Sequence, residues 1–246
     1  MLNGKNAIVT GANGGIGSAI VEEFLHQGAN VWACMRSGHP GLEADWLRTA
    51  REQGVWVKTI LFDMADTAQI KDGMKRILGD KFPIDVLVNN AGMVADSASF
   101  LMTSIDKMHT VFEVNFFAQM QVTQLAARAM MRKKSGSIVN IASIAALDGT
   151  PAELEYVASK AALVGATKKL AKELGIYQIR VNAVAPGVID TRMGNQIEKA
   201  LLEETLNGTV MKRLGKPEEI ARVAAFLAGD ASSFMTGQIV RADGGI

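Results

Sequence analysis

The stretch T-G-A-N-G-G-I-G, residues 10–17, decides the fold that this sequence predicts. A strand-like apolar run, Asn6–Val9, precedes it, and an amphipathic helical run, A-I-V-E-E-F-L, follows it. Glycines at positions 11, 15 and 17 allow a tight turn, bring backbone N–H groups close to a phosphate and let the helix pack against the strand. The stretch therefore predicts a strand, turn and helix that hold the pyrophosphate of a dinucleotide.

Short runs rich in Val and Ile alternate with longer helix-like segments along the rest of the chain. The seven expected strands are Asn6–Val9, Asn30–Met35, Val55–Phe62, Asp85–Asn89, Ser137–Ile141, Ile179–Ala185 and Ile239–Arg241. Helical lengths between strands imply parallel crossovers, and runs such as I-D-V-L-V lack the alternation of a half-exposed strand. We therefore predict an α/β fold in one domain, residues 1–246: a Rossmann-type doubly wound sheet of seven mostly parallel strands with helices on both faces.

Composition narrows the class of protein. The 246 residues are 48% hydrophobic, which suffices for a sizeable core. Lys and Arg total 26 against 25 Asp and Glu, so the net charge of +1 provides no broad field for nucleic acid or an anionic membrane. One cysteine, Cys34, and three scattered histidines offer neither an internal disulfide nor metal-ligand spacing. Because we also find no signal peptide and no apolar run near the roughly 18 residues of a membrane span, we expect a cytoplasmic protein without a metal.

The end of the second expected strand indicates which dinucleotide binds. An NAD site usually has an acidic residue there for the ribose 2′-hydroxyl, whereas a 2′-phosphate requires a cation and no carboxylate. Here the strand ends A-C-M-R-S, with Met35 in place of the acid and Arg36 able to fork around a phosphate. NADP(H) is therefore expected in preference to NAD(H), although solvated arginines are also common at strand ends. Asp63, in L-F-D-M, could contact the adenine amino group, but an Asp in D-M-A-D is equally typical of a helix N-cap.

Tyr156 and Lys160 lie four residues apart in the expected helix E-Y-V-A-S-K-A. Positions i and i+4 share a helix face, so the ammonium can lie close to the phenol oxygen and favour its ionised form. A phenol with an ordinary pKa near ~10 would then approach the range in which general acid–base catalysis is efficient. Ser143, after the fifth strand, supplies a hydroxyl that could hydrogen-bond a substrate carbonyl. Each feature alone is common in helices and turns, but together with the glycine turn they predict a catalytic site.

The sequence resembles the short-chain dehydrogenase/reductase family over essentially its whole length. The shared motifs are T-G-A-N-G-G-I-G at 10–17, N-N-A-G at 89–92, the Asn of F-E-V-N-F-F at 115, Ser143, Y-V-A-S-K at 156–160 and P-G-V-I-D-T at 186–191. The resemblance implies a catalytic tetrad of Asn115, Ser143, Tyr156 and Lys160. It implies that the tyrosine gives a proton to the carbonyl oxygen, the serine orients that oxygen, and the asparagine anchors a water of a proton relay. The lysine would also hold the nicotinamide ribose, and the cofactor would deliver hydride.

The same resemblance completes the set of candidate cofactor-binding residues. N-N-A-G is expected against the adenosine ribose, and P-G-V-I-D-T is expected against the nicotinamide. The full set is Gly11, Asn13, Gly14, Gly15, Ile16, Gly17, Arg36, Asp63, Met64, Asn90, Ala91, Gly92, Tyr156, Lys160, Pro186, Gly187, Val188 and Thr191. Asn13 stands where many NADP-preferring members have a basic residue, which leaves recognition of the 2′-phosphate to Arg36.

Within the family, the sequence is most similar to the 3-oxoacyl-acyl-carrier-protein reductases of fatty acid biosynthesis. The similarity lies in A-R-A-M-M-R-K-K-S-G-S-I-V, in R-L-G-K-P-E-E-I-A and in the final T-G-Q-I-V-R-A-D-G-G. It implies that Arg128 and Lys172 dock an acidic acyl carrier protein, although both could be ordinary solvated charges. The segment after N-N-A-G is one residue longer than the usual pattern, so a sugar, polyol, steroid or other small alcohol remains an alternative substrate. A non-catalytic dinucleotide-binding protein is a third hypothesis, against which the intact Ser, Tyr and Lys argue.

Two further features concern closure and assembly. Residues 193–216 form a polar stretch with Gly194 and Gly208, which suits a substrate lid. The run from Ile105 to Arg132 is apolar on more than one helical face, so one side is expected to contact the sheet and the other a partner subunit. The resemblance implies a homotetramer.

Overall fold

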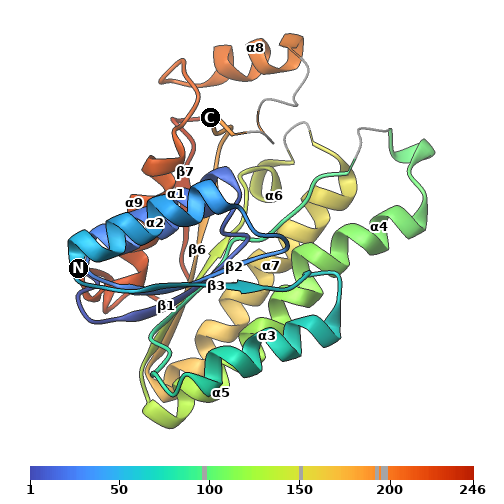
Figure 1. The fold of residues 1–246 in the computed structure, drawn as a ribbon. Coiled ribbons are helices and arrows are strands. Elements are labelled where there is room, and N and C mark those ends of the chain that lie inside the picture. Colours follow the sequence, from blue (N-terminus) through green and yellow to red (C-terminus); the bar gives the residue numbers. More distant parts are fainter. Residues whose placement is uncertain (96–98, 150–151, 192–193, 195–198) are drawn as a thin grey trace.

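The computed structural model describes residues 1–246 apart from 96–98, 150–151, 192–193 and 195–198, and it contains one seven-stranded sheet (Figure 1). The strands are β1 (Asn6–Thr10), β2 (Asn30–Met35), β3 (Val57–Leu61), β4 (Val86–Asn89), β5 (Gly136–Ile141), β6 (Ile179–Pro186) and β7 (Ile239–Ala242). All seven expected strands are confirmed to within about two residues at each end. Their order is β3-β2-β1-β4-β5-β6-β7, and every pairing between them is parallel.

Helices cover both faces of this sheet. They are α1 (Gly15–His26), α2 (Pro40–Gln53), α3 (Thr67–Gly79), α4 (Ile105–Phe112), α5 (Ala118–Lys133), α6 (Ala145–Asp148), α7 (Leu154–Leu174), α8 (Lys199–Gly208) and α9 (Pro217–Ala228). One hydrophobic layer joins α1, α2 and α9 to the sheet, and the other joins α3, α5 and α7 to its opposite face. In Figure 1, α1 and α2 lie on one side of the strands and α3 and α5 on the other. The predicted doubly wound Rossmann-type architecture is confirmed.

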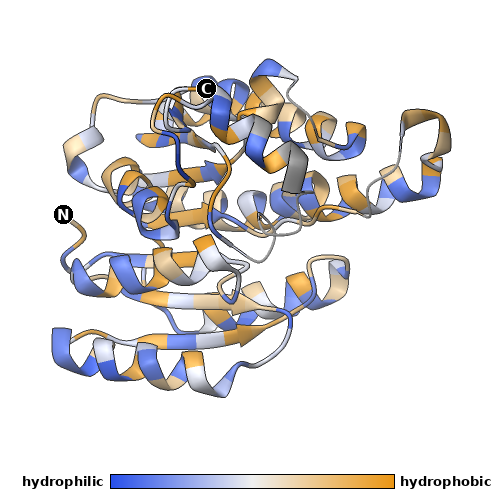
Figure 2. Ribbon diagram, turned by 90° about the horizontal axis from the view of Figure 1, so that it is seen from above, coloured by the Kyte–Doolittle hydropathy of each residue, from blue (hydrophilic) through white to orange (hydrophobic). Residues whose placement is uncertain are grey.

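The burial pattern of the first strand explains why helices must cover both faces of the sheet. Ala7 and Val9 belong to one hydrophobic layer, whereas Ile8 between them belongs to the other. All three are fully buried, because successive side chains of a strand point to opposite faces. The helices have the complementary pattern: Figure 2 shows them banded in hydrophilic and hydrophobic colours, as helices with one covered side require.

The strand order reverses between β1 and β4, which lie side by side in the centre of the sheet. In open α/β sheets, ligands bind in the crevice beyond the carboxyl ends of the strands at such a reversal. The glycine turn follows β1 and N-N-A-G ends β4, so the topology brings the two motifs together at that crevice.

The apolar run from Ile105 continues as one helical path through α4 and α5, but a π-helical turn, Glu113–Phe117, interrupts it. The lid expected at 193–216 falls partly outside the described residues, namely at 193 and 195–198. Its described part includes α8. None of the helices in the described part of the chain is long and apolar enough to span a lipid bilayer.

Candidate active site

The glycine turn after β1 lies against the end of β4. Gly11 has a φ of 63°, and a Cβ there would lie 2.7 Å from the Cα of Ala91. A Cβ at Gly17 would collide with the carbonyl oxygen of Gly11. Gly14 precedes α1 and provides no side chain to cap its first turn. The backbone N–H groups that begin α1 are thus available to a phosphate, which is the use that the sequence predicts for this turn.

Asn90 holds the glycine turn in place. Its Nδ2 donates to the carbonyl oxygens of Thr10 and Gly11, both at 3.0 Å. In return, the Thr10 hydroxyl accepts from the backbone N–H groups of Asn90 at 3.0 Å and Ala91 at 3.1 Å. The Thr10 hydroxyl also donates to the carbonyl oxygen of Val88 at 3.3 Å, so five hydrogen bonds of these two side chains join the ends of β1 and β4, and N-N-A-G shapes the turn.

Arg36 follows β2 at the same edge of the sheet. Its side chain is exposed and has no hydrogen bond or ion pair with any residue that the structure describes. Asp63 follows β3, and its carboxylate accepts from the backbone N–H of Ala65 at 2.9 Å. The N-cap of α3 is Asp66, which accepts from Ala68 and Gln69, so Asp63 does not cap that helix. Met64 is buried in the hydrophobic layer of α3, so its side chain faces the core.

Asn115 lies in the π-helical turn and is fully buried. Its side chain pairs with the backbone of Met93: Oδ1 accepts from the N–H at 2.8 Å, and Nδ2 donates to the carbonyl oxygen at 2.9 Å. Nδ2 also donates to the hydroxyl of Ser159 at 3.1 Å. The insertion of one residue per turn in a π-helix redirects side chains, and such turns are frequent at functional sites. Here the turn links the segment after β4 to α7.

Lys160 and Asn115 face the same small space beside Gly92. A Cβ at Gly92 would lie 3.4 Å from the Lys160 Nζ and 3.5 Å from the Asn115 Oδ1. The Nζ atom donates to the carbonyl oxygen of Ile141 at 2.7 Å. Burial lowers the pKa of Lys160 to about 8, because the charged ammonium loses its hydration.

Tyr156 and Ser143 come together from α7 and from the segment after β5. Burial raises the pKa of the Tyr156 phenol, a hydrogen bond with the Ser143 hydroxyl lowers it, and the charge of Glu153 raises it, so that the pKa lies above its ordinary value. Lys160 lies with its Nζ 5.9 Å from the centroid of the Tyr156 ring and is not among the causes of this shift. The expected lowering of the phenol pKa toward the neutral range is thus not met in this structure. Tyr156 is held in its protonated form, as an acid requires.

The segment after β6 crosses the glycine turn. A Cβ at Gly15 would lie 2.6 Å from the Thr191 Cγ2, which places Thr191 beside the start of α1. Gly187 donates from its N–H to Ala242 at 3.1 Å, and a Cβ there would lie 2.8 Å from the Cα of Asp243. Pro186 ends β6, and the carbonyl oxygen of Val188 accepts from Gly215 at 3.0 Å. The structure therefore brings all three expected cofactor segments to one edge of the sheet.

Sequence reasoning missed two residues that support this site. Ser159 is buried, and its hydroxyl donates to the carbonyl oxygen of Tyr156 at 2.8 Å while accepting from Asn115. Its place inside Y-V-A-S-K was the available signal. Arg241, on β7, binds Asp148 at the end of α6, the short helix that follows Ser143. Its Nη1 donates to the Asp148 Oδ1 at 2.9 Å, and its Nη2 lies 2.6 Å from the Asp148 Oδ2. No local pattern indicates this pair, since 93 residues separate its members.

The candidate docking residues lie away from the reaction centre. Arg128 and Lys172 are both exposed. Arg128 lines a groove of about 340 Å³ between α5 and α7. Lys172 follows Tyr156 by sixteen residues on α7, which corresponds to roughly 24 Å along the helix axis. In the described part of the chain, no group of three or more His, Cys, Asp or Glu side chains is arranged to hold a metal ion.

Comparison with known proteins gives consistent matches over the whole chain. A family model described as enoyl-(acyl carrier protein) reductase matches residues 11–246. A 3-oxoacyl-[acyl-carrier-protein] reductase of Chlamydia trachomatis is 40% identical over 247 residues, which cover 100% of this chain and 98% of that protein.

Two solved structures are similar in fold. A 3-oxoacyl-[acyl-carrier protein] reductase with bound NAD from Brucella melitensis has a TM-score of 0.88 at 32% identity. The match covers 99% of this chain and 91% of that chain. A mutant of a Serratia marcescens short-chain dehydrogenase/reductase has a TM-score of 0.90 at 32% identity, with 99% and 98% covered.

Proposed function

This chain belongs to the short-chain dehydrogenase/reductase family, and from that premise we propose that it reduces 3-oxoacyl thioesters on an acyl carrier protein with NADPH. Membership makes the chain an oxidoreductase. The choice of a carbonyl substrate is supported by one observation above all: the Ser143 hydroxyl lies close enough to Tyr156 to lower the pKa of its phenol, so two hydroxyl groups meet where one oxygen atom would be held. The names of the relatives from Chlamydia trachomatis and Brucella melitensis support the same substrate class.

The residues present fit a nicotinamide dinucleotide, which supplies the hydride when bound. The pyrophosphate would lie on the uncapped N-terminus of α1, in the turn that Asn90 holds. Ser143 orients the carbonyl oxygen, and Tyr156 gives it a proton. Lys160 and Asn115 face the space beside Gly92, where a water would return a proton to the phenol. Lys160 would also hold the nicotinamide ribose.

The preference for NADP(H) rests on the end of β2. Met35 is buried and carries no charge, whereas the exposed guanidinium of Arg36 is not engaged with any other described residue. A 2′-phosphate would therefore meet a cation without displacing an existing ion pair. The Brucella melitensis relative was solved with NAD, so the preference depends on this chain's own residues and needs a direct test.

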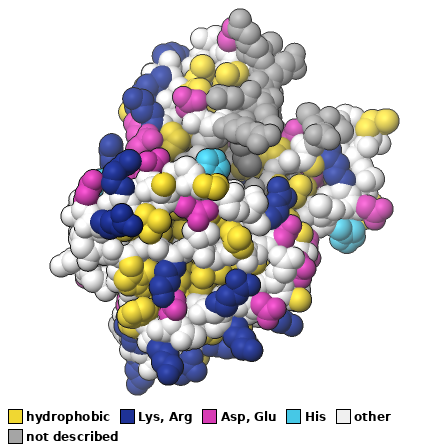
Figure 3. Space-filling model, in the orientation of Figure 1, with side chains coloured by type: hydrophobic (Ala, Val, Ile, Leu, Met, Phe, Trp, Pro, Cys, Tyr) yellow, Lys and Arg dark blue, Asp and Glu magenta, His cyan; other side chains and the backbone are white. Residues whose placement is uncertain are grey.

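Docking of a carrier protein would use Arg128 and Lys172. In Figure 3, basic side chains gather along the lower edge of the visible face, where Figure 1 places the end of α5. An acidic carrier would be attracted to such an edge by charge complementarity. The distance along α7 between Lys172 and Tyr156 then requires that the acyl group reach the reaction centre on an extended arm.

A homotetramer is part of the same proposal. Along the helical path from α4 to α5, Ile105 is 64% exposed and Phe117 is 52% exposed. Apolar side chains this exposed on a long helix are typical of a surface that a partner subunit covers. Sedimentation equilibrium measures the assembly directly, and a monomer at micromolar concentration would contradict it.

The deciding experiment follows NADPH oxidation with acetoacetyl thioester on acyl carrier protein and on a free small-molecule carrier, with NADH as the cofactor control. We expect turnover of both thioesters, with a lower KM for the carrier-linked one. Arg128→Glu should raise only that KM, whereas the matched exposed variant Arg222→Glu should leave both unchanged. A crotonyl thioester tests the enoyl reduction that the family model's description names. Reduction of crotonyl but not acetoacetyl thioester would overturn the proposal, and no turnover of either would point to sugars, polyols or other alcohols.

A further inference from the structure

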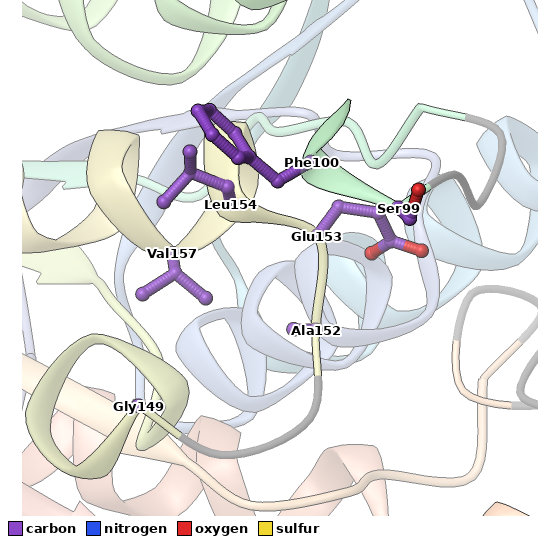
Figure 4. A pocket seen from close by; sticks show the side chains of 7 residues that line it. All are labelled: Ser99, Phe100, Gly149, Ala152, Glu153, Leu154 and Val157. Atoms are coloured by element: carbon purple, nitrogen blue, oxygen red, sulfur yellow. The ribbon is translucent and has the colours of Figure 1, made fainter. Parts of the chain in front are cut away.

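A pocket of about 390 Å³ opens between the start of α7 and the short helical turn Phe100–Met102. Its lining residues are Ser99, Phe100, Gly149, Ala152, Glu153, Leu154 and Val157. This volume falls within the range of small-ligand sites, about 300–1,000 Å³. Figure 4 shows the apolar side chains of Phe100, Leu154 and Val157 grouped together, with the oxygens of Glu153 and Ser99 to one side of them.

The walls of this pocket belong to the elements that carry the catalytic candidates. Val157 directly follows Tyr156 in the first turn of α7. Gly149 ends α6, the short helix that follows Ser143. Glu153 is close enough to Tyr156 for its charge to raise the pKa of the phenol. A substrate whose carbonyl contacts Ser143 and Tyr156 would therefore extend along the start of α7, where this pocket opens.

The facing wall comes from the short helical turn Phe100–Met102 before α4, and it is tied to α7. Lys107 of α4 pairs with the buried carboxylate of Glu155, with 3.6 Å between Nζ and Oε1. Phe100 is 63% exposed and Leu154 is 46% exposed, so their apolar surfaces remain available to a ligand. Glu153 introduces a negative charge into a mostly apolar cavity, which disfavours an anion there.

We propose that this pocket receives the apolar tail of the acyl substrate and that Glu153 rejects tails that end in a negative charge. The inference deepens the proposed function and rests on it, because the tail is defined relative to a carbonyl held by Ser143 and Tyr156. Each methylene group that enters the pocket is removed from water, whereas a terminal carboxylate would meet the carboxylate of Glu153.

Chain length provides the first test, with free 3-oxoacyl thioesters of increasing length as substrates. For the native chain, kcat/KM should rise about two- to fourfold per added methylene until the pocket is filled. Val157→Phe should remove this dependence, so that long thioesters react with the same kcat/KM as the acetoacetyl thioester in that variant. Phe100→Ser, on the exposed opposite wall, should weaken the same dependence. An unchanged chain-length dependence in both variants would overturn the assignment. The assignment would also be overturned if Val157→Phe affected only the carrier-linked acetoacetyl thioester. The pocket would then hold the arm of the carrier and not the acyl tail.

Charge provides the second test. Glu153→Gln should raise kcat/KM for a 3-oxoacyl thioester with a terminal carboxylate about tenfold more than for the neutral substrate of equal length, because both substrates share any effect on the Tyr156 phenol. Glu52→Gln, an exposed glutamate at the end of α2, is the matched control and should change neither. Equal changes for both substrates in Glu153→Gln would mean that Glu153 acts only on the chemical step and does not read the tail.

Failure of the proposed function can be distinguished from failure of the pocket. If no 3-oxoacyl thioester is reduced, titration calorimetry of a long-chain acyl thioester still reports on the pocket. If the long-chain thioester binds and Val157→Phe weakens this binding at least fivefold, the pocket remains a site for the apolar tail of another substrate. Binding that Val157→Phe leaves unchanged, or no binding at all, would overturn the pocket.

Discussion

The Nζ atom of Lys160 donates a 2.7 Å hydrogen bond to the carbonyl oxygen of Ile141, which joins α7 to the end of β5. The ammonium is thereby held beside Gly92, with its Nζ 5.9 Å from the centroid of the Tyr156 ring. In this arrangement a buried cation and a protonated phenol lie one helical turn apart, and each has a pKa displaced by burial.

Lys160→Met should stabilise the cofactor-free chain in a pH-dependent way. The folded-state pKa of Lys160 is about 8 against 10.5 in the unfolded chain, so the unfolded chain binds more protons between these two pH values. The native lysine therefore costs roughly 3 kcal/mol at and below about pH 8, and this cost disappears as the pH rises toward 10.5. Lys160→Met removes this cost, but it also loses the hydrogen bond to Ile141, which lowers the stability of the variant by about 1 kcal/mol at every pH. Urea unfolding of both chains across this range should show the advantage of Lys160→Met shrinking with rising pH; a constant difference would contradict it.

The titration of Tyr156 can be observed directly, because the chain contains only two tyrosines. Tyrosinate absorbance of the native chain should show one group that ionises above the ordinary value of about 10, and Tyr156→Phe should remove that group. Ser143→Ala should move it still higher, since the hydroxyl lowers the pKa. Tyr156→Phe should also retain cofactor binding and lose the chemical step. Full activity of that variant would rule out Tyr156 as the acid.

Asn115→Leu should destabilise the fold by about 2–4 kcal/mol. The replacement has a similar volume but leaves the N–H and carbonyl groups of the partly buried Met93 without their partner. Urea unfolding measures the loss, and hydrogen exchange at the Met93 amide should accelerate. Gln124→Leu, at an exposed position of α5, is the matched control and should stay within about 0.5 kcal/mol. Equal effects of the two variants would mean that the pairing with Met93 contributes nothing.

Arg36→Ala should weaken NADPH binding by tenfold or more and NADH binding by about twofold at most. A charge-assisted contact to the 2′-phosphate contributes about 1.5–3 kcal/mol, and NADH lacks that group. Fluorescence titration of each cofactor gives the two dissociation constants. Arg222→Ala removes an exposed arginine from α9 and controls for net charge. A similar loss for both cofactors would mean that Arg36 does not read the phosphate.

Much of the fold could be predicted because its signals are local. An unalternating apolar run such as Asp85–Asn89 indicates a strand buried on both faces, and the observed β4 lies within it. Gly11, Gly15 and Gly17 leave no room for a side chain where the strand turns into the helix, which is the pattern of a dinucleotide-binding turn. Spacing likewise placed Tyr156 and Lys160 one turn apart on α7.

The parts that could not be predicted depend on contacts between distant segments. The sequence does not indicate that Asn115 pairs with Met93 from a π-helical turn, or that Arg241 reaches Asp148 across the sheet edge. It also led to the wrong direction for the pKa shift of the Tyr156 phenol. The ammonium bonds to Ile141, and burial, which depends on the whole packed structure, raises the pKa of the phenol.

The sequence by itself thus determined the doubly wound sheet, the glycine turn and the types of residue at the candidate site, because these follow from local patterning and from spacing along one helix. Only the tertiary structure decided how those residues are charged, which backbone groups hold them, and where the apolar pocket beside Tyr156 opens. Burial and long-range hydrogen bonds arise when β4, β5 and α7 pack together, and no single segment carries that information.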